Sequence, residues 1–169
     1  MASKALLLVD LENEWLDKKS DYFVGDISMI LARTNWLIDI CRKRGYKIIF
    51  ITHIEKGSDS AFAENSRNVE LIEGLHKRKD DPLIKKNKIS PFYKTTLAKE
   101  LNGVKEMAVS GILSNLCVRS TIQDAYDRDF NITVVKDCCA SFNKKTQDFT
   151  FADLKFTRPE IEFVNLKDF

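Results

Sequence analysis

The stretch ALLLVD, residues 5–10, indicates the fold class of this chain. Five apolar residues in a row that end at an acidic residue are typical of a strand buried on both faces, as in a parallel sheet. Further segments of strand character are KIIFIT at 47–52, PLIK at 82–85, EMAVSGI at 106–112, ITVV at 132–135 and IEFV at 161–164. The sequence therefore predicts six strands.

Segments of helical periodicity separate these strands. Apolar residues recur at helical spacing from Ile27 to Cys41, and Gly45 ends that helix. Further helices are predicted at 68–75, 95–101, 115–128 and 146–155. This alternation predicts an α/β fold with three α-β-α layers around a six-stranded, mostly parallel, Rossmann-like sheet. The chain shows no linker and no repeat, so residues 1–169 are expected to form one domain.

Composition and charge exclude several classes of protein. Hydrophobic residues make up 44% and charged residues 31%, which is typical of a globular domain and too apolar for a disordered chain. The net charge is only +2, so we expect no nucleic-acid partner. No apolar run approaches the roughly 18 residues of a membrane span. We therefore expect no membrane partner and a cytoplasmic location.

The four cysteines are Cys41, Cys117, Cys138 and Cys139. They are too few for a disulfide framework, and they lack the CxxC spacing of structural zinc sites. The adjacent Cys138 and Cys139 could form a vicinal disulfide, although buried packing after a strand is the favoured interpretation. The remaining question is which thiol is reactive.

Candidate functional residues follow the predicted strands. Parallel sheets bind ligands at the carboxyl ends of their strands, which are followed here by Asp10, His53, Lys86 and the segment 111–117. A buried carboxylate needs a partner, so Asp10 is expected to have one. A loop-capping Asp10, a solvated Lys86 and a pocket-rim His53 are the alternatives at these positions.

Cys117 is the most specific of these candidates. It lies near the predicted start of a helix, where free N–H groups and the helix dipole favour a thiolate, and a nearby lysine would lower its pKa further. An aspartate within reach could take the thiol proton. A cysteine in a helix is by itself more often a core residue, but an acid, a lysine and a cysteine at three strand ends favour a nucleophile.

Three blocks of sequence resemble the isochorismatase-like cysteine hydrolases, which include nicotinamidases and N-carbamoyl amide hydrolases. These blocks are LLLVDLENEW (6–15), KNKISPFYKTTL (86–97) and VSGILSNLCVRSTIQDAYDRDFNITVVKDCCASF (109–142). The last block is the most specific, because it combines a Gly-Ile pair, four residues and Cys-Val with a following T-x-x-D-A. The resemblance covers nearly the whole chain.

The resemblance implies a catalytic triad. Asp10 would be the general base and acid, Lys86 would polarise the pair, and Cys117 would attack a carbonyl-type carbon. The backbone N–H groups of Leu113 and Cys117 would form the oxyanion hole, preceded by a cis peptide between Ile112 and Leu113. In addition, Trp15, Phe92 and His53 are candidates for the substrate pocket, although the two aromatic residues could equally be core or interface residues.

The sequence departs from the family pattern at two places. Glu12 stands where many members have Gln, so hydrogen bonding beside Asp10 is expected to differ. The only histidines are His53 and His76, without the Asp-x-His spacing of the nicotinamidase metal site, so no metal and no cofactor are expected. The isochorismate-cleaving members lack the cysteine. Its presence here therefore implies an amide, imide or carbamoyl-type substrate.

The predicted function is thus a metal-independent cysteine hydrolase that cleaves a C–N bond of a small molecule through an acyl-enzyme on Cys117. The alternatives are a nicotinamidase with an altered or absent metal site, and a non-catalytic redox or interaction module that retains the fold. The resemblance also implies a homo-oligomer, a dimer or larger. Candidate contact residues, which could also be core residues, are Phe142, Phe149, Phe151 and Phe156.

Overall fold

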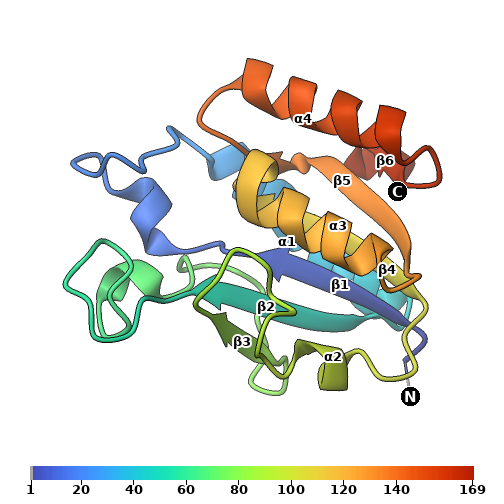
Figure 1. Cartoon of the computed structure of the whole chain (residues 1–169), viewed down its shortest axis with the longest axis horizontal. Helices are drawn as coiled ribbons and strands as arrows, with labels where there is room; N and C mark the ends of the chain where they lie inside the picture. Colours follow the sequence, from blue (N-terminus) through green and yellow to red (C-terminus); the bar gives the residue numbers. More distant parts are fainter. Residues whose placement is uncertain (1) are drawn as a thin grey trace.

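The computed structural model describes residues 2–169 and shows one six-stranded sheet with helices on both faces (Figure 1). The strands are β1 (Lys4–Val9), β2 (Lys47–His53), β3 (Leu83–Lys86), β4 (Glu106–Ile112), β5 (Asn131–Ala140) and β6 (Glu162–Val164). The helices are α1 (Ser28–Lys43), α2 (Leu97–Glu100), α3 (Arg119–Tyr126) and α4 (Lys144–Thr157). None of the helices in the described part of the chain is long and apolar enough to cross a membrane.

The sheet has the order β3-β2-β1-β4-β5-β6, and every neighbouring pair of strands is parallel. The predicted three-layer α/β fold is therefore confirmed. The chain first builds outward from β1 to β3 and then returns to build outward from β4 to β6. In sheets of this kind the reversal point, here between β1 and β4, leaves a crevice at the carboxyl ends of the strands.

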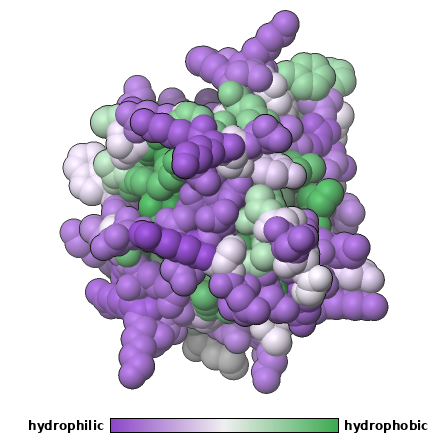
Figure 2. Space-filling model, turned by 90° about the vertical axis from the view of Figure 1, so that its left-hand side faces the viewer, coloured by the Kyte–Doolittle hydropathy of each residue, from purple (hydrophilic) through white to green (hydrophobic). Residues whose placement is uncertain are grey.

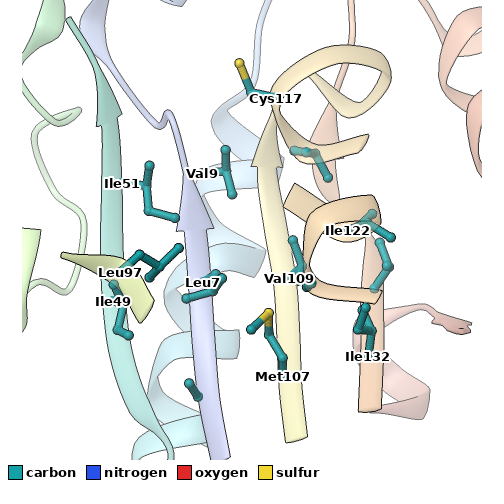
Figure 3. Close-up of a cluster of buried hydrophobic side chains, with 14 of the residues drawn as sticks. Leu7, Val9, Ile49, Ile51, Leu97, Met107, Val109, Cys117, Ile122 and Ile132 are labelled. Atoms are coloured by element: carbon teal, nitrogen blue, oxygen red, sulfur yellow. The ribbon is translucent and has the colours of Figure 1, made fainter. Parts of the chain in front are cut away.

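Alternation along β1 divides the core into two layers. Leu7 and Val9 pack on one face of the sheet with Leu97 of α2 and Ile122 of α3, as Figure 3 shows. Leu6 and Leu8 point to the opposite face, which α1 covers. Both faces of the central strand are fully buried, which explains its uninterrupted apolar run.

The predicted helix at 68–75 is wrong. Only a short 3₁₀ turn forms there, Arg67–Val69, and the following Leu71 instead makes an antiparallel bridge with Glu12. The backbone groups of this segment thus pair with the loop after β1, so they do not form the hydrogen bonds of a helix. The pairing joins the two long loops that lie above the carboxyl ends of β1 and β2.

The strand predicted at 132–135 is too short, because β5 continues to Ala140. The β4–β5 register shifts between Val109 and Gly111, and the pairing then resumes with Gly111 opposite Cys139. Gly111 has φ +136°, and a Cβ atom there would lie 2.0 Å from the Val9 carbonyl oxygen. Only glycine therefore allows β1 and β4 to approach this closely near their carboxyl ends.

Candidate active site

Three predicted residues meet at the carboxyl ends of the strands. Asp10 directly follows β1, Lys86 is the last residue of β3, and Cys117 lies in a π-helical turn (Ser114–Val118) after β4. Lys86 Nζ lies 2.8 Å from Asp10 Oδ2 and 3.3 Å from Cys117 Sγ. Figure 3 shows Cys117 above the apolar cluster, with its sulfur beyond the ends of β1 and β4. The sheet thus brings together an acid, a lysine and a thiol.

The Lys86 ammonium has a third polar neighbour, His53 Nδ1, at 3.4 Å. Its three N–H donors therefore face three different groups, Asp10, Cys117 and His53. The side chains of Lys86 and Asp10 are both fully buried. Lys86 points inward because residues alternate along β3, which leaves Lys85 exposed. The alternative of a solvated Lys86 is therefore wrong.

The charges at this site influence one another. Burial alone would lower the pKa of Lys86, but the facing carboxylate of Asp10 and the sulfur of Cys117 raise it above its usual value. Burial lowers the pKa of His53, and the positive charge of Lys86 lowers it further. His53 is therefore a neutral imidazole at pH 7, and its Nδ1 can accept a hydrogen bond from Lys86.

The expectation that Cys117 has a lowered pKa is wrong. Burial and the negative charge of Asp10 raise the pKa of its thiol well above the usual value, and Lys86 offsets this only in part. Only 7% of Cys117 is exposed. The face of the molecule toward which β1 points in Figure 1 is mainly hydrophilic with small apolar areas, as Figure 2 shows. The resting residue is therefore a thiol, and a nearby base must take its proton before the sulfur can attack.

Asp10 is held in an uncommon backbone conformation, with φ 50°. Its N–H donates to the Ile51 carbonyl at 2.9 Å, and its own carbonyl accepts a hydrogen bond from Trp15 Nε1. A non-glycine residue in this region costs about 1–3 kcal/mol, and such strain occurs most often at functional sites. These two hydrogen bonds therefore fix the direction in which the carboxylate leaves β1.

The loop after β4 carries Cys117 and has a fixed backbone. The peptide bond between Ile112 and Leu113 is cis. In the turn that follows, the N–H of Val118 donates to the Leu113 carbonyl at 3.0 Å, and Thr121 Oγ1 donates to the Cys117 carbonyl at 2.7 Å. These bonds fix the backbone of both residues that the sequence proposed as oxyanion donors.

Aromatic side chains pack beside the buried cluster. Trp15 and Tyr22 both lie against Phe62, with ring centroids 5.5 and 5.0 Å apart, and the His53 ring lies 5.3 Å from the Phe62 ring. Two of the predicted pocket residues, Trp15 and His53, are thus brought together, whereas Phe92 lies outside this group. Tyr22 and Phe62 were missed because they lie in irregular loops without periodicity.

The histidines are not placed to share a metal ion with other donors. Across residues 2–169, no group of three His, Cys, Asp or Glu side chains has suitable geometry. His53 lies between Lys86 and Glu55, and His76 pairs with Asp39 of α1. The side chains present therefore do not fit the metal site of nicotinamidases.

The reversal of strand order and the buried acid–lysine–cysteine cluster beside it define a doubly wound α/β protein with a buried polar cluster at its switch point. Residues 4–160 match the isochorismatase domain. The chain therefore belongs to the isochorismatase family and is a hydrolase of that family.

Relatives support this assignment over most of their length. Nicotinamidase 3 of Arabidopsis thaliana is 28% identical over 90% of this chain and 80% of its own length. The isochorismatase family protein YaaI of Bacillus subtilis (strain 168), itself uncharacterized, is 30% identical over 88% and 86%. A cysteine hydrolase of known structure from Pseudomonas syringae pv. phaseolicola has a TM-score of 0.88 at 21% identity, covering 98% of this chain and 90% of that chain.

Proposed function

We propose that this protein is a metal-independent cysteine hydrolase that cleaves a C–N bond in a small amide, imide or carbamoyl-type substrate. The observation that carries the proposal is the buried Lys86 ammonium, 2.8 Å from Asp10 and 3.3 Å from Cys117. A lysine in this position stabilises negative charge on either partner. It can therefore hold the pair through a proton transfer from the thiol to the carboxylate.

Acylation begins when Asp10 takes the proton of Cys117 and the sulfur forms a bond to the substrate carbonyl carbon. The carbonyl oxygen becomes negatively charged, and the backbone N–H groups of Leu113 and Cys117 donate hydrogen bonds to it. As the carbonyl re-forms, the C–N bond breaks and Asp10 returns its proton to the leaving nitrogen. The products of this stage are ammonia or an amine and a thioester on Cys117.

Deacylation repeats the same steps with water. Asp10 takes a proton from a water molecule, whose oxygen attacks the thioester carbon, and the C–S bond then breaks. The sulfur regains the proton from Asp10, which restores the resting thiol. The raised pKa of Cys117 favours this last step, because burial and Asp10 both disfavour a free thiolate.

The substrate is proposed to be small and partly apolar. Trp15, Tyr22 and Phe62 form an aromatic cluster beside His53, of which Tyr22 is the exposed member, and aromatic rings can bind planar groups. Two relatives are named for related activities, Nicotinamidase 3 of Arabidopsis thaliana and the cysteine hydrolase of Pseudomonas syringae.

The test is hydrolysis of a panel of small amides, imides and N-carbamoyl compounds by the wild-type protein and by Cys117→Ala. The matched control is Cys41→Ala, which removes a buried thiol from α1 on the opposite face of the sheet. We expect turnover of at least one substrate, loss of turnover in Cys117→Ala, and retention in Cys41→Ala and in the presence of a chelator. A Cys117→Ala protein with full activity, or loss of activity on chelation, would contradict the proposal.

Nicotinamide is the second candidate substrate. Two observations favour it: the aromatic group around Phe62, and the similarity of this chain to Nicotinamidase 3. Turnover of nicotinamide that a chelator leaves unchanged would establish this candidate, and no turnover would remove it. Failure of the entire panel would favour a non-catalytic module that retains the fold.

The protein is further proposed to assemble with copies of itself in the cytoplasm. Phe149 and Phe156 are 70% and 88% exposed and lie two turns apart on one side of α4, whereas Phe151 is buried and belongs to the core. The four free cysteines fit a reducing compartment. Light scattering should report a dimer or larger assembly that Phe149→Ser with Phe156→Ser dissociates, and a wild-type monomer at micromolar concentration would contradict it.

A further inference from the structure

Glu12 is a buried carboxyl group that the proposed reaction does not use. Its side chain is fully buried, and no side chain of the described residues donates a hydrogen bond to either of its oxygens. Nearby Glu14 is almost equally buried, but its oxygens accept hydrogen bonds from Ser20 and Asn68. A buried carboxylate without partners is strongly disfavoured, so the two neighbouring acids have different environments.

Four groups act on the charge of Glu12. Asp10 and Glu14 bring negative charge on either side of it in the chain, the Lys86 ammonium brings positive charge from β3, and the backbone N–H of His53 faces it from β2. Burial and the charge of Asp10 raise the pKa of Glu12 well above its usual value, and Lys86 and His53 offset this only in part.

An ion pair distinguishes Asp10 from Glu12. Lys86 Nζ lies 2.8 Å from Asp10 Oδ2, so Asp10 has a direct ion-pair partner. No ion pair of this kind is found for Glu12 in the described part of the chain. Two neighbouring buried carboxyl groups do not both ionise readily. Glu12 has no ion pair, so Glu12 is the group that keeps its proton.

We propose that Glu12 is a positioning residue, held as a neutral carboxylic acid beside the Asp10–Lys86 ion pair, which keeps Asp10 as the one anionic base of the site. An ionised Glu12 would compete with Asp10 for the Lys86 ammonium. Glu12 thus sets an upper pH limit on the reaction, and this consequence rests on the proposed function.

The charge of Glu12 can be tested without any substrate. Infrared spectra of the wild-type protein at neutral pH should contain the carbonyl band of a protonated carboxyl group, and Glu12→Gln should remove it. The control Glu14→Gln replaces a buried carboxyl with hydrogen-bond partners of its own and should keep the band. Absence of the band from the wild-type protein, or its persistence in Glu12→Gln, would overturn the proposal whether or not the protein hydrolyses amides.

The positioning role is tested by the pH dependence of kcat/KM on an amide from the panel. Glu12→Gln should remain active at neutral pH, because glutamine is neutral and of the same size. Its alkaline loss of activity should begin about one pH unit or more above that of the wild type, the scale of shift caused by a neighbouring like charge. Glu14→Gln should keep the wild-type limb. An unshifted limb in Glu12→Gln would overturn the role, even with the infrared band present.

Discussion

Replacement of Lys86 by methionine keeps the length of the side chain and removes its charge. The ammonium and the Asp10 carboxylate are both fully buried and 2.8 Å apart, so the variant leaves a buried carboxylate without its partner. Removal of one member of a buried pair typically costs about 3–5 kcal/mol, compared with about 0–1 kcal/mol for an exposed pair. The free energy of unfolding should therefore fall by about 3–5 kcal/mol, and hydrolysis should be lost.

Urea unfolding of four proteins separates the ion pair from local packing: wild type, Lys86→Met, Asp10→Asn and the double variant. The double variant should be more stable than the sum of the two single losses predicts, because neither charge is then left unpaired. The matched control is Lys85→Met on the exposed side of β3, which should change stability by less than about 0.5 kcal/mol. A cost of Lys86→Met below about 1 kcal/mol, or strictly additive losses, would refute the reasoning.

Three other predictions concern individual residues around the site. Gly111→Ala should destabilise the protein by more than about 1 kcal/mol in urea unfolding, because its Cβ would meet the Val9 carbonyl at 2.0 Å; unchanged stability would contradict this. Above pH 4.5 the unfolded chain loses a Glu12 proton that the native protein keeps. Rising pH therefore costs the wild type about 1.4 kcal/mol per pH unit relative to Glu12→Gln, up to the native pKa of Glu12, and parallel stability curves would count against it. Finally, iodoacetamide should alkylate Cys117 slowly at neutral pH and faster as the pH rises, because burial and Asp10 raise its pKa; rapid alkylation at pH 7 would contradict the geometry.

The fold was predictable because its central strands are buried on both faces and therefore read as uninterrupted apolar runs. Asp10 and Lys86 were predictable as neighbours for the same reason, since parallel strands end at one edge of the sheet. The structure of the segment 68–75 was not predictable from local patterns, because this segment pairs with the distant loop at Glu12.

The electrostatic properties of the site were harder to predict from the sequence. The position of Cys117 near a helix start indicated a lowered pKa, but burial and the charge of Asp10 raise the pKa and outweigh Lys86. Similarly, nothing in the spacing of Tyr22 or Phe62 connected them with Trp15. Both residues lie in irregular loops, whose shape depends on the rest of the fold. Burial and loop packing are properties of the folded chain, and local patterns do not contain them.

The most direct test of the central claim is intact-protein mass spectrometry after rapid acid quenching during turnover of the best substrate from the panel. The account predicts a transient mass increase equal to the substrate minus its leaving amine, located on the peptide that contains Cys117 and absent from Cys117→Ala. Turnover that accumulates no adduct and persists in Cys117→Ala, or an adduct on another residue, would contradict it.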